Sequence, residues 1–368
     1  VLLSLNYGIC KHSAFGFAAY GMLLCQQMGD IKTGSRLGKL GGKMLEGFNE
    51  PSCFVRVNAI IYGRINVWNE PIQMSLKPLL ESHKTGMSTG DIESAMQNLQ
   101  AYLILSFHSG EKLEVLSNKM KVACSKMKEY NQDLMAIPTK ICWQCVLNLL
   151  GQSDDPIQLS GDALDQKETL KTIHESIRDW SEWFIYCNSM WLAYWFGRYD
   201  LAAELAANTR CTPAMCIGVT SCDRLFCDGL ISFVLAQKKK EKRWRDIGFE
   251  AVEKMRKWAD TSEWNFRHKF ELLCAELFIL DNYKERAAKS YDNAISLACS
   301  HGFINDEALA CERAGIFYQS CGNFNAASTY YSRSHDCYKK WGAHIKAKHV
   351  GKRKAAMEGK ASVGVCNR

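Results

Sequence analysis

The sequence predicts an all-α chain, an α-solenoid of stacked antiparallel helix pairs, from three observations. Only 6 of the 368 residues are proline, so helices can run with few forced interruptions. Almost no Val, Ile or Thr run alternates at period two, and no Asn-Gly or Asp-Gly turn joins such runs, which argues against strands. Turns of similar spelling recur between amphipathic stretches. Recurrence at about 34–47 residues is typical of helical-repeat arrays.

The recurring turns are five short segments in which Gly or Asp precedes a polar residue and then a large apolar one. They read MGDI (28–31), TGDI (89–92), FGRY (196–199), LDNY (280–283) and CGNF (321–324). Glycine can end one helix in the left-handed conformation, and Asp or Asn can cap the next. A sixth stop, HGF, separates two apolar stripes at 287–298 and 304–318. We therefore predict structural turns at Gly29, Gly90, Gly197, Asp281, Gly302 and Gly322.

Two further features of the turns predict close packing and a period. A small residue follows four of the five segments, at Gly34, Ala95, Ala202 and Ala327, which lets the helices of a pair approach closely. Gly322 lies 41 residues after Asp281, and Asp281 lies 84 after Gly197. A hidden turn is therefore expected near residue 239. It coincides with the basic run KKKEKR (238–243), which we interpret as a solvated turn.

The composition along the chain divides it into four segments. Residues 1–150 are predicted to form an N-terminal helical array with irregular turn spacing. Residues 151–167 contain Gly, Ser, Asp and Pro without a helical stripe, which predicts a loop. Residues 168–350 are predicted to be the regular repeats, and the Gly- and Lys-rich residues 351–368 a frayed basic tail.

The bulk properties favour a cytoplasmic protein with a sizeable core. Hydrophobic residues make up 47% and charged residues 23% of the chain, which excludes a disordered protein. The net charge of +7 does not by itself indicate nucleic acid. The 17 cysteines lie scattered on apolar faces and are interpreted as reduced thiols. The most apolar stretch, 13–29, is shorter than the ~20 residues of a membrane span. Because the chain starts at Val1 without Met, we expect a fragment of a longer polypeptide.

No constellation of catalytic, cofactor-binding or metal-ligating residues emerges, so we expect no enzyme activity and no cofactor in this chain. LGKLGGKM (37–44) lacks the first Gly and the final Ser or Thr of a phosphate loop and lies in a helical stripe. The lone Cys142-x-x-Cys145 has no second pair to complete a zinc site and is interpreted as core thiols. Asp154 and Asp155 lie in the predicted loop and are interpreted as solvated.

The aromatic and basic clusters leave one alternative open. The aromatic residues of 180–196 follow helical spacing, which favours a helical core over a base-stacking surface. The run 238–245 and the basic tail could contact a phosphate backbone, and such binding would weaken steeply with salt. A nucleic-acid-binding array is therefore kept as an alternative, although we expect a protein partner first.

Residues 264–350 resemble the TPR-like helical region of large multidomain signalling proteins that carry an AAA-type, STAND-like ATPase, among them hybrid histidine kinases and serine/threonine kinases. The resemblance is carried by nine residues spread through WNFRHKF and the segment 291–346: Asn265, Phe266, His268, Glu307, Glu312, Tyr338, Trp341, Gly342 and Lys346. It implies a TPR-like solenoid in a signal-transduction protein. This chain contains no ATPase, kinase or GAF sequence, so no catalytic residue of those proteins is carried over.

Together these observations predict a non-catalytic TPR-like scaffold or regulatory segment of a multidomain ATPase or kinase. We expect the concave face of the stacked helices to bind a protein partner or the adjacent ATPase or kinase domain of the same polypeptide, with no membrane partner. A freestanding adaptor scaffold is the second hypothesis, and the nucleic-acid-binding array is the third.

Overall fold

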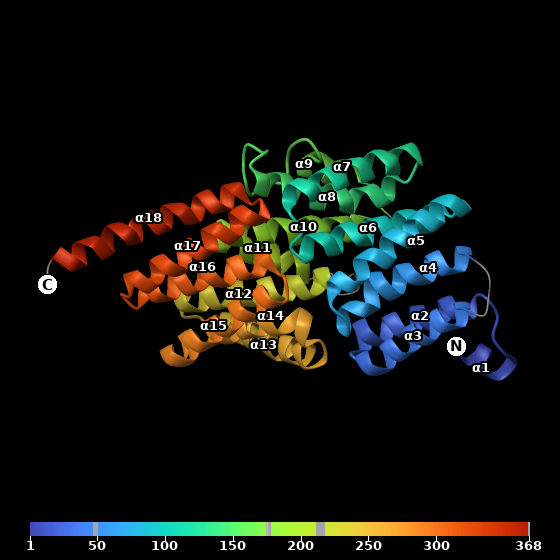
Figure 1. Cartoon of the computed structure of the whole chain (residues 1–368), viewed down its shortest axis with the longest axis horizontal. Coiled ribbons are helices and arrows are strands. Elements are labelled where there is room, and N and C mark those ends of the chain that lie inside the picture. Colours follow the sequence, from blue (N-terminus) through green and yellow to red (C-terminus); the bar gives the residue numbers. More distant parts are fainter. Residues whose placement is uncertain (47–50, 174, 176–177, 211–217, 367–368) are drawn as a thin grey trace.

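The computed structural model describes residues 1–46, 51–173, 175, 178–210 and 218–366 (Figure 1). Within them the chain is helical, and the only β structure is an isolated bridge between Ser160 and Asp165. The helices are α1 (Leu2–Tyr7), α2 (Ser13–Leu23), α3 (Ile31–Glu46), α4 (Pro51–Ile60), α5 (Leu76–Thr89), α6 (Ile92–His108), α7 (Leu113–Glu129), α8 (Asp133–Leu150), α9 (Gln166–Thr172), α10 (Arg178–Trp195), α11 (Tyr199–Arg210), α12 (Val219–Lys239), α13 (Lys242–Thr261), α14 (Glu263–Leu280), α15 (Lys284–Ser300), α16 (Ile304–Ser320), α17 (Phe324–Trp341) and α18 (His344–Cys366). Short π and 3₁₀ segments follow α2 and α4.

The helices form an inner and an outer layer. From α4 to α16 each even-numbered helix packs against the next even-numbered one, and each odd-numbered partner packs outside as the second member of a pair. This is the arrangement of an α-solenoid, in which short pairs are stabilised by stacking on their neighbours. The predicted all-α, TPR-like solenoid is therefore confirmed.

The predicted turns lie between helices, with one change of residue. Gly29, Gly90, Gly197, Gly302 and Gly322 all have φ between 71° and 81°, the left-handed conformation. At the LDNY turn the left-handed residue is Asn282, with φ 59°, and not Asp281, which ends α14 with φ −87°. Asparagine tolerates this conformation because its short polar side chain can bond locally.

The hidden turn falls where the period placed it. Lys240 is left-handed, with φ 55°, between α12 and α13, and Lys238–Arg243 are exposed. The left-handed residues within the pairs α10–α11, α12–α13, α14–α15 and α16–α17 are therefore Gly197, Lys240, Asn282 and Gly322, which recur every 40–43 residues. The pairs α12–α13, α14–α15 and α16–α17 are each longer than the about 34 residues of a standard TPR, because their helices run 17–21 residues.

Small residues let the paired helices cross closely, as their spacing predicted. A Cβ added at Gly34 would lie 2.5 Å from the carbonyl oxygen of Gly21 on α2, so only glycine fits this crossing. Ala95 plays the same part in the next pair, where a Cβ at Gly86 would lie 2.8 Å from its Cβ. Ala202 and Ala327 are fully buried.

The segment after α8 is a loop that is fixed to that helix. Gln144 Oε1 accepts hydrogen bonds from the backbone N–H groups of Ala163 and Leu164, at 3.0 and 3.3 Å. Asn148 Nδ2 donates to the carbonyl of Gln158 at 2.6 Å. Helix α9 already begins at Gln166, inside the range predicted as loop, because the Asp165 side chain caps it.

The C-terminal segment differs from the prediction of a frayed tail after residue 350. Helix α18 continues from His344 to Cys366 without interruption. Its early part is anchored by Val350 and Met357, which are buried. A Gly- and Lys-rich composition has low helix propensity on average, but packing of an apolar edge outweighs propensity.

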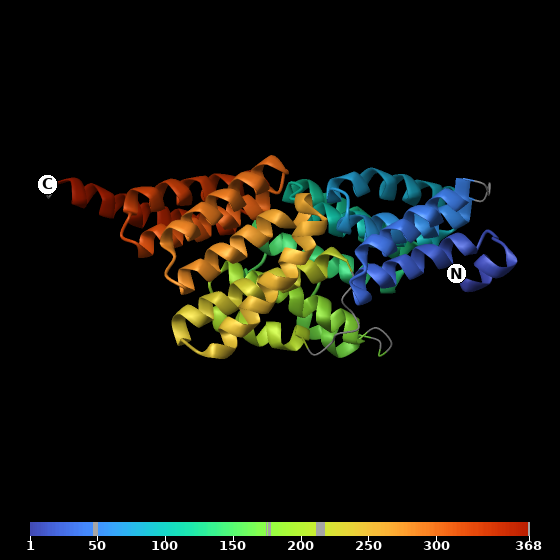
Figure 2. The ribbon, with the colours of Figure 1, turned by 90° about the horizontal axis from the view of Figure 1, so that it is seen from below.

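The two ends of the chain lie at opposite ends of the long axis, and the middle helices lie to one side (Figures 1 and 2). Contacts between distant turns nevertheless connect the halves. Asn265 on α14 donates to the carbonyls of Val67 and Glu70 and accepts from the N–H of Ile72, at 2.8–3.0 Å. Helix α18 packs against α8. Contacts between residues far apart in the sequence therefore hold the inner layer together.

Candidate functional site

The nine residues that carry the resemblance are all buried, and most lie on the inner layer. They come from α14, α16, α17, α18 and the α17–α18 turn. Six of them are polar or charged side chains. Burying a charge costs several kcal/mol unless it is paired, so the partners of these groups decide what the inner face can do.

The first buried cluster surrounds Lys269, the neighbour of His268. Its ammonium bonds Asp306 of α16 and lies 3.1 Å from Asp223 of α12. His268 Nε2 lies 2.8 Å from the same Asp306, and His108 of α6 bonds Asp223. Burial by itself would lower the pKa of Lys269, but the two aspartates outweigh it and the pKa is raised. The cluster therefore ties four inner helices together.

The second cluster joins α14 to α16. Arg313 donates two hydrogen bonds to the carboxylate of Glu276, at 2.7 and 2.6 Å, in the bidentate geometry that arginine favours. The Tyr291 hydroxyl of α15 donates to Glu276 at 2.7 Å. Arg313 and Glu276 are 5% and 0% exposed, so the pair is out of contact with solvent.

The third cluster joins α16 to α18. Lys346 Nζ donates to Glu312 at 2.7 Å and to the backbone carbonyl of Trp195, and the Tyr338 hydroxyl donates to Glu312 at 3.1 Å. Trp341 packs edge-on against Trp195. Gly342, with φ 99°, turns the chain where a Cβ would lie 2.6 Å from Glu114 of α7. These contacts hold the last helix on the middle of the chain.

The three clusters limit the space that the solenoid offers to a partner between its inner helices. Their charged groups are paired with one another, and the cavity enclosed between α6, α8 and α10 has a volume of only about 20 Å³. A partner segment could enter only by separating helices that the ion pairs hold together. The space between the inner helices is therefore structural core, and binding of a partner to the concave face stays a prediction.

Two histidines that are shielded from water lead us to predict that the free energy of unfolding falls in mild acid. Burial lowers the pKa of His268, and it lowers that of His349 on α18 to about 4. Between about 6.5, the unfolded pKa of histidine, and the folded pKa, the unfolded chain binds protons that the folded chain does not. The free energy of unfolding should therefore fall as the pH falls from 7 to 5. Urea denaturation followed by circular dichroism at several pH values measures this.

His349→Gln is the matched test of that prediction, because it keeps a polar side chain without a titrating group. The slope of stability against pH between 6.5 and 4.5 should be smaller in this variant than in the parent chain. His12→Gln, which changes an exposed histidine, should leave the slope unchanged. An unaltered slope in His349→Gln would show that the neutral imidazole is not what the fold requires.

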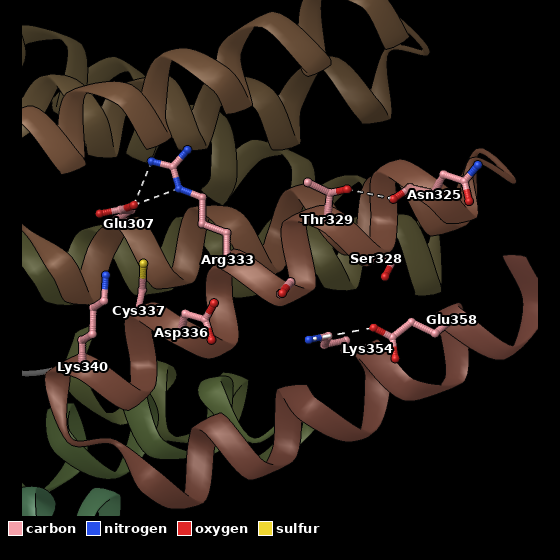
Figure 3. A pocket seen from close by; sticks show the side chains of 11 residues that line it. Glu307, Asn325, Ser328, Thr329, Arg333, Asp336, Cys337, Lys340, Lys354 and Glu358 are labelled. Carbon is pink, nitrogen blue, oxygen red and sulfur yellow. Dashed lines mark hydrogen bonds and ion pairs between the residues drawn. The ribbon is translucent and has the colours of Figure 1, made fainter.

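An open groove lies on the outer side of the C-terminal helices, between α17 and α18 (Figure 3). It has a volume of about 870 Å³. One wall is α17, the other is the outer part of α18, and Glu307 of α16 lies at one end. The lining residues are polar or charged except for one thiol: Glu307, Asn325, Ser328, Thr329, Ser332, Arg333, Asp336, Cys337, Lys340, Lys354 and Glu358.

The chemistry of this groove suits binding and not nucleophilic catalysis. Arg333 donates to Glu307 at 2.9 Å, and Lys354 lies 3.8 Å from Glu358, so both signs of charge occur along the walls. Ser328, Ser332 and Asn325 offer hydroxyl and amide groups that can both donate and accept. Burial raises the pKa of the Cys337 thiol to about 12, so at neutral pH it is a thiol and a poor nucleophile.

The other sequence motifs lie in structural settings. The segment 37–44 is inside α3, as predicted. Cys142 and Cys145 are buried on α8, where burial raises the pKa of Cys142 to about 12. Asp154 and Asp155 are exposed in the loop. Trp183, Phe184, Tyr194 and Trp195 are buried, which confirms the helical-core interpretation for that part of the aromatic cluster.

Two kinds of feature are absent from the residues that the structure describes. No group of three or more His, Cys, Asp or Glu side chains is arranged to hold a metal ion. None of the helices has the length and apolar character needed to cross a bilayer.

The comparisons with known proteins do not extend to the function of this chain. No protein-family model and no curated protein matches the chain. The apo form of the quorum sensor NprR from B. thuringiensis is similar over 90% of each chain, with 13% identity and a TM-score of 0.49. A circular tandem repeat protein is similar over 95% of this chain and 97% of its own, with 10% identity and a TM-score of 0.24. The solenoid class therefore rests on the helices and contacts of this chain itself.

Sequence reasoning missed the partners of the motif residues and the groove. Asp306, Arg313 and Glu276 lie off the apolar stripes, where a charge normally indicates solvent. The sequence signal for their burial is that α14 and α16 also carry Ala and Cys on their remaining faces. Such a distribution is typical of a helix that is buried all round.

Proposed function

We propose that this chain is a non-catalytic scaffold or regulatory segment of a multidomain ATPase or kinase signalling protein, and that the groove between α17 and α18 holds a polypeptide segment of the adjacent domain. The observation that carries the proposal is the groove itself. An extended segment brings unpaired backbone N–H and C=O groups, which need partners when they leave water. The hydroxyl and amide groups of α17 supply such partners, and charges of both signs can pair with its side chains.

The closed inner layer supports the same assignment. Because Lys346 of α18 and Tyr338 of α17 both bond Glu312 of α16, the two walls of the groove are held together at their shared end before a segment binds. A preorganised site loses less conformational entropy on binding. The solenoid thus provides a rigid frame with an external site.

A photo-cross-linking experiment in the native polypeptide tests the proposal. Benzoyl-phenylalanine replaces Ser332, which lines the groove, and, as the control, Lys289, which is exposed on α15. We expect cross-links from position 332 to another domain of the same polypeptide, and none from position 289. Mass spectrometry of the cross-linked peptides identifies the partner.

The other outcomes separate the alternatives. A cross-link from position 332 to a separate protein would favour the freestanding adaptor scaffold. Cross-links to nucleic acid alone, with binding that weakens steeply in salt, would favour the nucleic-acid-binding array that the exposed turn Lys238–Arg243 suggested. Identical patterns at positions 332 and 289 would show that the groove is not a binding site.

A further inference from the structure

A second groove lies on the outer surface of the N-terminal half, between α5 and α7, with α6 as its floor. Helices α5 and α7 both pack on α6 and leave an open space of about 830 Å³ between them. The floor contains Leu99 and Leu103, and the walls contain Leu80 and Met87 of α5 and Val122 of α7. Val122 is 57% exposed, which is high for a valine.

The rim of this groove carries one sign of charge. Lys84 lies on the α5 wall and Lys126 on the α7 wall, and the lining contains no Asp or Glu. Neither lysine has a carboxylate within ion-pair distance among the described residues. A third lysine, Lys119, bonds the Tyr102 hydroxyl at 2.6 Å and also Glu111. The two lysines thus lie on opposite walls of a groove with an apolar floor, and no carboxylate of the described residues neutralises them.

The length of the groove matches that of a short α-helix. The lining residues run from Leu80 to Ser88 on α5 and from Asn118 to Tyr130 on α7, which at 1.5 Å per residue is about 12 and about 18 Å. This is the length of two to three helical turns. Leu80 and Met87 are seven residues apart, so their wall presents apolar side chains at the repeat that an amphipathic helix also presents.

We infer that the groove between α5 and α7 binds an acidic amphipathic helix of a partner protein, whose apolar face contacts α6 and whose carboxylates pair with Lys84 and Lys126. The inference rests on the proposed role as a scaffold but uses a different surface from the α17–α18 groove. Apolar contact supplies most of the affinity, and the two lysines select the charge of the partner.

Fluorescence anisotropy with the full chain tests the inference. The probe is a labelled peptide of about 14 residues, with leucines at i, i+3, i+4 and i+7 and glutamates on the flanks. The control peptides replace every Glu by Lys, or every Leu by Ser. We expect saturable binding of the first peptide alone. Its absence up to about 1 mM, which corresponds to only ~4 kcal/mol, would overturn the inference.

Variants of the chain locate the site. Lys84→Glu with Lys126→Glu should weaken binding about tenfold or more, because two attractions become repulsions. Val122→Glu should weaken it similarly without disturbing the core, since the side chain is largely exposed. Lys121→Glu is the matched control, because Lys121 is exposed on α7 but does not line the groove, and it should leave binding unchanged.

Three further outcomes would overturn the inference. Equal binding of an oligonucleotide of similar charge would show that the positive charge alone determines binding. The same conclusion would follow if Lys121→Glu weakened peptide binding as much as the double variant does. Concentration-dependent dimerisation that Val122→Glu abolishes would show that a second copy of the chain occupies the groove. Failure of the cross-link at position 332 would leave peptide binding here intact, so the two proposals fail separately.

Discussion

Replacing Arg313 by Met should lower the free energy of unfolding by about 3–5 kcal/mol, because it leaves a buried carboxylate without its counter-charge. Glu276 is fully buried and receives two of its hydrogen bonds from Arg313. The Tyr291 hydroxyl remains, but one neutral donor does not replace a guanidinium. Urea denaturation at pH 7, followed by circular dichroism, measures the loss.

Two variants control this experiment. Glu276→Gln combined with Arg313→Met removes both charges and should recover most of the loss, because the amide can still accept from Tyr291. Arg245→Met breaks a pair with Asp281 at 2.7 Å, in which the two side chains are 50% and 27% exposed. That change should cost less than about 1 kcal/mol. Equal losses in Arg313→Met and Arg245→Met would show that burial does not determine the strength of these pairs.

Replacing Lys269 by Met should cost a similar amount at pH 7 and should also change the response to pH. Burial raises the pKa of Asp306, and the Lys269 ammonium is the main group that outweighs burial and lowers it. Without the ammonium, the folded chain should bind a proton at Asp306 that the unfolded chain releases above about pH 4. The stability difference between parent and variant should therefore shrink as the pH falls from 7 to 5.

The control for this second prediction removes the carboxylate charge instead of protonating it. Lys269→Met combined with Asp306→Asn should be more stable than Lys269→Met at pH 7, and its difference from the parent should depend less on pH. Lys257→Met, on the exposed face of α13, should change neither quantity. A stability difference that stays constant between pH 7 and 5 in Lys269→Met would contradict the assigned role of the ammonium.

Local features of the fold could be predicted from the sequence because each depends on a few neighbouring residues. In these turns the glycine ends its helix in the left-handed conformation, and so five of the six predicted turn residues are left-handed. The period located the turn at Lys240 although its basic run contains no glycine. At Asp281 the turn was predicted correctly but the left-handed residue was not, since Asp and Asn stand side by side there.

The binding surfaces and the inner clusters depend on contacts that no local pattern contains. Asn265 bonds residues nearly 200 positions earlier, and Lys346 bonds a carbonyl 151 positions earlier. Both stand beside apolar residues in amphipathic helices, where a polar residue normally indicates solvent. The two grooves are formed by residues of three helices each. Their existence depends on how those helices are spaced, which the sequence does not state.

The contact of α18 with α8 has a consequence for how the chain unfolds. An open array of repeats contacts only its neighbours, so its stability is a sum along the chain and it can lose repeats from an end one at a time. Here Lys346 of the last helix bonds the carbonyl of Trp195 in the middle of the chain, and Asn265 of α14 bonds the segment after α4. Loss of the terminal pair would expose buried charges in the centre. We therefore expect the array to unfold as one cooperative unit, although it is built from local pairs. We also expect it to fold slowly, because contacts between residues distant in the sequence form slowly.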